Sequence, residues 1–212
     1  IDDKYKSTVS GKDALAQELS QKEQQLNEQA AQLNEQAKRM ADLQGILDKK
    51  DRQLHLLKEK VTEALTGFED KGLSIHTKNG KVYVSMDEKL LFSSGSWTVN
   101  PRGREALYEI ANVMAKDASI HVMVEGHTDD VPLRGKGEVK DNWDLSVKRA
   151  TSIVRIILEN KGINPANIMA CGRSEFVPLA SNDTPENRAR NRRTEIILTP
   201  DLDELFRILE TN

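Results

Sequence analysis

A seven-residue repeat of apolar side chains runs through the N-terminal third of this sequence. From Leu19 onward every seventh position is apolar, and the series reads Leu19, Leu26, Leu33, Met40, Leu47, Leu54, Val61 and Phe68. The companion positions, four residues before each of these, are apolar only at the two ends and at Leu43; they hold Leu15, Lys22, Gln29, Gln36, Leu43, Lys50, Leu57 and Ala64. A sustained period of seven residues is typical of a left-handed coiled coil. The spacing therefore predicts a long helix over 19–68 that self-associates.

The polar companion positions are expected to weaken this pairing and to fix its register. A single extended helix that serves only as a spacer is the alternative. In either case the segment 1–71 sets distance and valency and carries no chemistry, and His55 within it is a solvated helix position. We therefore divide the chain into a coiled-coil helical stalk, 1–71, and a second domain, 72–212.

Composition supports this division and excludes several classes of protein. Charged residues make up 31% of the 212 residues and aromatic residues 4%, which is too polar for one compact globule of this length. A net charge of −3 gives no reason to expect nucleic-acid binding. The single cysteine, Cys171, excludes an intramolecular disulfide framework and a cysteine-rich zinc site. No run of about 18 apolar residues is present that could span a bilayer.

Strand and helix patterns alternate after residue 72. Strands are predicted at 73–76, 82–86, 120–125, 168–171 and 194–198, with a hairpin turn at Thr77-Lys78-Asn79-Gly80. Helices are predicted from Pro101, over 145–160, from Thr184-Pro185, and from Asp201 to about Glu210. This order predicts an α+β fold, a two-layer α/β sandwich of the form β-α-β-α-β-α-β.

Several motifs in residues 82–199 resemble the OmpA-like peptidoglycan-binding domain, which is also found in Pal lipoproteins and in the flagellar stator protein MotB. The motifs are Gly126-His127-Thr128-Asp129-Asp130-Val131-Pro132, Asn142-Trp143-Asp144-Leu145-Ser146 with Arg149-Ala150, Gly172-Arg173-Ser174-Glu175 with Pro178, Asn182, Asn187-Arg188, and Asn191-Arg192-Arg193-Thr194-Glu195. Pro132 stands where the OmpA pattern has glycine, and together with Asn142-Trp143 this looks closer to the MotB branch. The stalk is not covered by the resemblance.

The resemblance implies a site for the peptide stem of peptidoglycan, usually for its diaminopimelate residue, which ends in an ammonium and a carboxylate on one carbon. Asp129 matches the residue of the family that binds the ammonium, and Arg149 matches the residue that binds the carboxylate. A planar guanidinium can hold a carboxylate through two parallel hydrogen bonds. Arg193 is a weaker candidate for contact with the ligand or with Asp129. The expected supporting residues are Thr128, Asn142, Leu145 and Ser146.

Other interpretations of the same residues remain open. Asp129 and Arg149 could form an internal salt bridge that only braces the loop, and Asp130 could be a solvated loop residue or a helix-capping group. The basic run 188–193 could be a solvated face or could contact anionic glycan stems. A zinc site built from His121, Glu125, His127 and Asp129 lacks a recognisable ligand spacing. A thiol nucleophile at Cys171 beside His127, or a carboxylate pair at Asp129-Asp130, is disfavoured as well. We therefore expect no catalysis, no metal and no cofactor.

The sequence thus predicts a non-enzymatic envelope protein that binds peptidoglycan in the periplasm, associated with the outer membrane of a Gram-negative cell, and that forms a homo-oligomer through its stalk. The chain opens at Ile1 rather than Met. We therefore expect a membrane anchor N-terminal to it, either a lipidated cysteine or a transmembrane helix. The alternative is an oligomeric scaffold, or an interaction protein of a motor or secretion system, with little intrinsic affinity for peptidoglycan.

Overall fold

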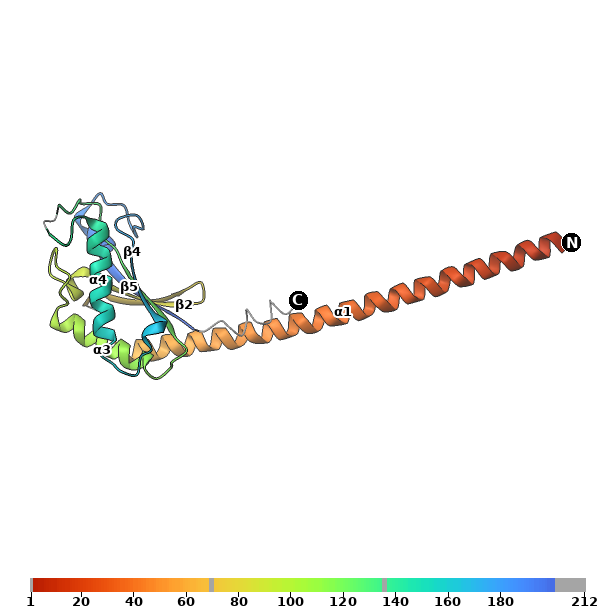
Figure 1. Cartoon of the computed structure of the whole chain (residues 1–212), viewed down its shortest axis with the longest axis horizontal. Helices are drawn as coiled ribbons and strands as arrows, with labels where there is room; N and C mark the ends of the chain where they lie inside the picture. The colour runs from red at the N-terminus through yellow and green to blue at the C-terminus, as the bar shows by residue number, and fades with distance from the viewer. Residues whose placement is uncertain (1, 69–70, 135–136, 201–212) are drawn as a thin grey trace. The chain divides into compact units, whose positions relative to one another are not determined.

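A computed structural model describes residues 2–68, 71–134 and 137–200 of the chain (Figure 1). Two compact units divide it, Ile1–Lys49 and Lys50–Asn212. Among the described residues, none of the helices is both long enough and apolar enough to cross a membrane. The C-terminal helix predicted from Asp201 lies outside the described residues.

Helix α1 spans Asp2–Ala64 and divides its seven-residue apolar series between two environments. In the first unit the series is open, since Leu19, Leu26, Leu33 and Met40 are 60–74% exposed. In the second unit the last turns of α1 belong to the core of the domain, where Leu57 and Val61 are buried. The part of the repeat after Lys50 therefore packs within its own chain.

The domain is built on one five-stranded sheet with the order β1-β2-β5-β3-β4. Strands β3 and β4 are parallel, and the other neighbours are antiparallel. The strands are β1 Leu73–Lys78, β2 Lys81–Asp87, β3 His121–Gly126, β4 Ile168–Gly172 and β5 Arg193–Thr199. The predicted hairpin turn joins β1 to β2, with positive φ at both Asn79 (50°) and Gly80 (69°), as a tight two-residue turn requires.

Helices α3 and α4 form the second layer and lie side by side (Figure 1). Their apolar residues pack on the inward residues of the sheet, among them Val84, Val124 and Ile196, all fully buried. The helices of the domain are α2 Glu88–Leu91, α3 Pro101–Met114, α4 Asn142–Ile157 and α5 Pro185–Asn191, with a 3-10 turn at Pro165–Asn167. The predicted two-layer fold is confirmed, whereas α2 had no clear signal in the sequence.

Helix α4 begins three residues earlier than predicted. The side chain of Asp141 caps the helix by accepting a hydrogen bond from the backbone N–H of Asp144 at 2.9 Å. The sequence pattern had placed the start at Leu145, because the apolar periodicity becomes regular only there. Arg149 consequently lies about two turns into the helix.

Two glycines at the ends of adjacent strands allow α4 to approach the sheet closely. A Cβ atom on Gly126 would lie 2.2 Å from the carbonyl oxygen of Ser146, and a Cβ atom on Gly172 would lie 2.2 Å from the Ser146 hydroxyl oxygen. No side chain fits at either position without moving the helix. Gly126 and Gly172 thus set the distance between α4 and the loop that follows β3.

Replacing Gly126 by Ala should lower the free energy of unfolding by about 1–3 kcal/mol or more, because the methyl group would collide with backbone rather than with a flexible side chain. Urea unfolding followed by circular dichroism measures this change. Gly45→Ala is the matched control: it lies in the interior of α1 with no atom within 4 Å of its Cβ position. The control should be neutral or slightly stabilising, and an equally neutral Gly126→Ala would contradict the close packing.

Candidate functional site

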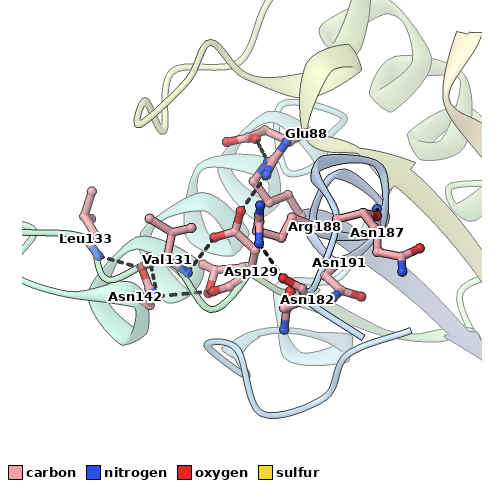
Figure 2. Close-up of polar contacts among 12 residues, drawn as sticks. Glu88, Asp129, Val131, Leu133, Asn142, Asn182, Asn187, Arg188 and Asn191 are labelled. Atoms are coloured by element: carbon pink, nitrogen blue, oxygen red, sulfur yellow. Dashed lines mark hydrogen bonds and ion pairs between the residues drawn. The ribbon is translucent and has the colours of Figure 1, made fainter. Parts of the chain in front are cut away.

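Asp129 lies in the loop that follows β3, three residues after Gly126, and is 7% exposed. Its Oδ1 atom accepts a hydrogen bond from the backbone N–H of Val131 at 3.1 Å. Its Oδ2 atom pairs with Nη1 of Arg192 at 2.5 Å. Figure 2 shows the carboxylate of Asp129 directed toward the backbone of Val131. The backbone of the loop fixes one oxygen of the carboxylate, and Arg192, 63 residues further along the chain, fixes the other.

Arg149 projects from α4 and is almost completely buried, with 3% exposure. Its Nε atom donates to the backbone carbonyl of Ser96 at 2.9 Å, and its Nη2 atom pairs with Oε1 of Glu88 at 2.5 Å. The guanidinium carbon lies 4.9 Å from the centre of the Phe92 ring, at a distance typical of a cation–π contact. The orientation of the Arg149 side chain is thus set by three separate contacts.

Glu88 and Arg192 connect Asp129 to Arg149. The second oxygen of Glu88, Oε2, pairs with Nε of Arg192 at 2.6 Å. The four side chains therefore form a row, Asp129–Arg192–Glu88–Arg149, in which negative and positive charges alternate and sum to zero. We call these four residues the charge row. The sequence placed Asp129 and Arg149 at one site, and in the structure they are linked through two intermediate groups.

Arg192 is the more accessible arginine of the charge row, since 28% of its side chain is exposed. Burial tends to lower the pKa of Arg192, but the hydrogen bond to Asp129 and the charges of Glu88 and Asp129 raise the pKa above its ordinary value. Arg192 therefore remains charged at every physiological pH. It presents a cation on the side of the charge row that faces solvent.

Asn142 anchors the loop that carries Asp129. Its Nδ2 donates to the carbonyl oxygens of Asp129 (3.3 Å) and Val131 (3.1 Å), and its Oδ1 accepts from the N–H of Leu133 at 3.3 Å. Figure 2 shows these three bonds radiating from a single side chain. The first residue of α4 therefore holds the shape of the loop.

Thr128 and Ser146 also support the loop through backbone contacts. The hydroxyl of Thr128 donates to the carbonyl of Asp129 at 2.9 Å, and its N–H donates to the carbonyl of Ser174 at 2.9 Å. Ser146 is fully buried and accepts from the N–H of Ser174 at 3.3 Å. Leu145 is buried as well, at 6% exposure. Of these three residues Thr128 bonds to Asp129 directly, and the hydrogen bonds of Thr128 and Ser146 are made within the protein itself.

Arg193, the weaker candidate from the sequence, does not pair with Asp129. It is 4% exposed, and its Nε pairs with Oε1 of Glu195 at 2.7 Å. The physical reason is the alternation of side chains in β5, which brings residues 193 and 195 to the same face. The neighbouring residue, Arg192, precedes the strand and reaches Asp129 instead.

Asn191 holds a second loop beside the charge row. It is fully buried, donates to the carbonyl of Ala180 (2.8 Å) and to Oδ1 of Asn182 (2.7 Å), and accepts from the N–H of Leu179 at 2.8 Å. The side chain of Arg188 donates to the carbonyl of Asn182. Asn191 and Arg188 of α5, both labelled in Figure 2, therefore hold the shape of this loop. At least part of the basic run is thus structural.

A separate ionic cluster brings Glu125, His127 and Glu195 together, with ligand atoms within 4.8 Å of one another. The Nε2 atom of His127 lies 3.2 Å from Oε1 of Glu125 and 4.0 Å from Oε2 of Glu195. Each carboxylate also pairs with an arginine, Glu125 with Arg173 at 3.0 Å and Glu195 with Arg193. The carboxylates are thus neutralised by arginines of the chain itself. His121 is exposed and Asp129 belongs to the charge row, so the zinc set considered from the sequence is not assembled.

Cys171 lies at the edge of this cluster, with its sulfur 3.6 Å from Oε2 of Glu125. Burial and the negative charge of Glu125 raise the pKa of the Cys171 thiol to about 11. The thiol is therefore protonated at neutral pH, the opposite of what a nucleophilic cysteine requires.

Two members of the charge row, Glu88 and Arg192, were not proposed as site residues from the sequence. Arg192 lies within a motif that carried the family resemblance, so a signal for it was present. Glu88 begins the short helix α2, outside every recognised motif. Only the folded chain reveals its role, because its partners Arg149 and Arg192 are 61 and 104 residues away.

Residues 91–192 match the model of the OmpA family, and this part of the chain is an OmpA/MotB-like domain. Over 117 residues the chain is 32% identical to motility protein B of Bacillus subtilis, a match that covers 55% of this chain and 44% of that protein. The chain spans about half the length of the curated relatives it matches.

Solved structures agree with this assignment. A MotB-like protein from Desulfovibrio vulgaris superposes with a TM-score of 0.67 at 26% identity, covering 74% of this chain and 96% of that one. The cell wall anchor of the type VI secretion system (T6SS) of Pseudomonas aeruginosa superposes with a TM-score of 0.61 at 28% identity, covering 68% of this chain and 99% of that one. The predicted resemblance to the OmpA-like and MotB-like domains is therefore confirmed.

The ionic cluster predicts a specific loss of stability in acid. His127 and the hydrogen bond from Arg173 lower the pKa of Glu125 from 4.5 to about 2, against the opposing effect of burial. A carboxyl group with a lowered pKa stabilises the fold above its unfolded pKa, and this stabilisation disappears as the pH falls through the folded pKa. The contribution of Glu125 is therefore complete above about pH 4.5 and is lost between about pH 4.5 and 2.

Urea unfolding at a series of pH values from 7 to 2 measures this contribution. Glu125→Gln should show a shallower decrease of unfolding free energy below pH 4.5 than the unmutated chain, whereas the exposed control Glu105→Gln should retain the original slope. Should Glu125→Gln fail to fold, an NMR titration of the Glu125 carboxyl in the unmutated chain gives the same information. A midpoint near 4.5 in that titration would contradict the assignment.

Proposed function

We propose that this protein binds the peptide stems of peptidoglycan without catalysis and thereby anchors an envelope protein to the cell wall. Two observations support the proposal: the OmpA-family match and the likeness to a solved cell wall anchor. The observation that carries it is the charge row at the end of β3, which contains both residues that the family resemblance assigned to the stem peptide.

The charge row suits a zwitterionic ligand in particular. A diaminopimelate head group carries an ammonium and a carboxylate, and its net charge is zero, like that of the row. The ligand ammonium takes the place of Arg192 beside Asp129, and the ligand carboxylate accepts from the arginine that is released. No buried charge then remains without a partner. The exchange therefore avoids the large free-energy cost of leaving a buried charge unpaired.

The role of Arg149 in this scheme is to contact the ligand carboxylate, as the resemblance implies. Its guanidinium is 3% exposed and paired with Glu88, so the ligand reaches it only if Glu88 turns toward Arg192. Arg192, which is more exposed, provides the first cation that an approaching carboxylate meets. Thr128, Asn142, Leu145 and Ser146 hold the loop, and Arg193 holds the adjacent sheet face.

Binding to the cell wall implies a location in the periplasm or elsewhere in the cell envelope. The finer assignment, association with the outer membrane through an N-terminal anchor, is part of the proposal. The partners are peptidoglycan and a second copy of the chain, and no nucleic acid is required. The long α1 then acts as a spacer between the anchor and the wall-binding domain.

Isothermal titration of the whole chain with a diaminopimelate-containing muropeptide tests the binding. Asp129→Ala and Arg149→Ala should each weaken binding by at least about 30-fold, since removing one partner of a desolvated charge pair costs roughly 2–5 kcal/mol. Arg192→Ala should weaken binding as well.

Asp130→Ala is the matched control, because Asp130 is the exposed neighbour of Asp129 and should bind as the unmutated chain does. Circular dichroism at the titration temperature verifies that each variant is folded. Absence of binding by the unmutated chain would reject the proposal and favour a scaffold in which oligomerisation is the main activity.

Self-association through α1 is the second part of the proposal. Four apolar residues of the seven-residue series, Leu19, Leu26, Leu33 and Met40, are at least 60% exposed in the single chain. Leaving such a stripe in water is unfavourable by roughly 25 cal/mol per Å² of apolar surface, and pairing with a second helix would bury it. The pairing is confined to the part of α1 before Lys50, since the later turns pack on the domain.

Sedimentation velocity should show an oligomer for the whole chain and a monomer for the double variant Leu26→Ser/Leu33→Ser. The control Asn27→Ser/Asn34→Ser changes the adjacent positions of the same two heptads and should leave the oligomer intact. A monomeric unmutated chain at micromolar concentration would contradict pairing and leave the helix as a single spacer.

A further inference from the structure

A cleft next to the Asp129 loop is lined by two exposed aromatic side chains, Trp143 and Phe176, that take no part in the charge row. It encloses about 280 Å³, near the lower end of the range for small-molecule sites, which suits a ligand the size of one sugar ring. Its apolar wall consists of Pro132, Leu133, Trp143 and Phe176. Its polar rim includes the carboxylates of Asp141 and Glu175. We call this the aromatic cleft.

Two aromatic rings form the floor of the aromatic cleft. The ring centres of Trp143 and Phe176 are 5.6 Å apart and the ring planes are inclined by 32°, so the two rings lie close together at a tilt. Trp143 is 48% exposed and Phe176 is 65% exposed. Aromatic rings left in water beside each other retain hydrophobic free energy that a ligand can recover, and their electron-rich faces attract C–H groups.

The rim of the aromatic cleft adds hydrogen-bond acceptors. Asp141 uses Oδ1 to cap α4, and Glu175 uses Oε2 to accept from the hydroxyl of Ser174. Each carboxylate thus has a second oxygen that the hydrogen bonds among the described residues do not use. Carboxylate oxygens accept from hydroxyl groups and repel anions. The combination of an aromatic floor with two carboxylates at its edge matches a pyranose ring, which has C–H groups on one face and hydroxyl groups around its perimeter.

Asn142 is shared by the aromatic cleft and the Asp129 loop. It lines the cleft, and its side-chain amide bonds to the carbonyl oxygens of Asp129 and Val131. A ligand in the cleft therefore lies next to the residue that holds the Asp129 loop. Peptidoglycan offers this arrangement, because each stem peptide is covalently attached to a sugar of the glycan strand.

We propose that the aromatic cleft binds one face of a sugar ring of the glycan strand that bears the stem peptide, with Trp143 and Phe176 against the ring and Asp141 and Glu175 accepting from its hydroxyl groups. This inference rests on the proposed function and extends it from the peptide stem to the glycan. The domain then contacts both the stem peptide and the sugar to which it is attached. The sugar–peptide unit therefore binds more tightly than the peptide alone.

Titration of the whole chain with two ligands tests this inference. One ligand is the diaminopimelate-containing stem peptide alone, and the other is a muropeptide in which the same stem is attached to its disaccharide. The unmutated chain should bind the muropeptide about tenfold more tightly than the peptide, or about 1.4 kcal/mol. Trp143→Ala and Phe176→Ala should each reduce this difference toward zero while leaving the affinity for the peptide unchanged.

Leu179→Ala is the control for the loss of an exposed apolar side chain, since Leu179 is 55% exposed and does not line the cleft. Phe176→Ala lies in a loop and does not depend on the folding of α4, so it remains informative if Trp143→Ala is unstable. In a Trp97→Phe background the fluorescence of Trp143 should change on addition of the muropeptide and remain constant with the peptide. Because the ligand is a neutral sugar, the tenfold difference should persist in about 0.5 M salt.

The outcomes separate this inference from the proposed function. Equal affinity for the two ligands, unchanged in Trp143→Ala and Phe176→Ala, overturns the sugar site and leaves stem binding intact. A difference that disappears at high salt overturns it as well, because contacts with an uncharged sugar are not screened by salt. Binding of the muropeptide without any binding of the peptide supports the cleft and rejects the charge row as the stem site. No binding of either ligand rejects both, and the exposed aromatic pair is then a surface for a protein partner.

Discussion

The close approach of α4 to the ends of β3 and β4 is the constraint on which the candidate site depends. Gly126 and Gly172 leave no room for a side chain, and the backbone and hydroxyl of Ser146 occupy that space. This packing places the start of α4 directly against the loop after β3. Asn142 can therefore bond to that loop, and Arg149 points from the same helix toward α2. A helix held further away would separate the loop from its supports.

The alternation of charge in Asp129, Arg192, Glu88 and Arg149 explains how a partly buried ionic site remains stable without a ligand. Each interior charge of the row touches two opposite charges, so desolvation of one group is offset by its neighbours. The proposed binding of a zwitterion uses the same property, because one positive and one negative group of the ligand would replace internal partners one for one. A site built from a single exposed Asp and a single exposed Arg would hold a ligand in a less well defined orientation.

Much of the fold was predictable from local patterns. The alternation of Val82, Val84 and Met86, the turn at Asn79-Gly80 and Pro101 at the start of α3 each identify an element through its own sequence. Asp129 was located by its motif directly after a strand. The pairing of Asp129 with Arg192 could not be predicted, because it depends on whether residue 192 or 193 begins the strand. Glu88 could not be predicted either, since its partners come from distant parts of the chain.

The partners of the seven-residue repeat could not be predicted from the sequence either. The periodicity identifies an apolar stripe on α1 but does not show which residues pack against it. Leu57 and Val61 continue the stripe of α1, yet they are buried in the domain. This has a mechanical consequence. A pull along α1 would load the apolar contact of its last turns in shear, so that tension reaches the sheet through packed side chains and not only through the peptide link at Gly67.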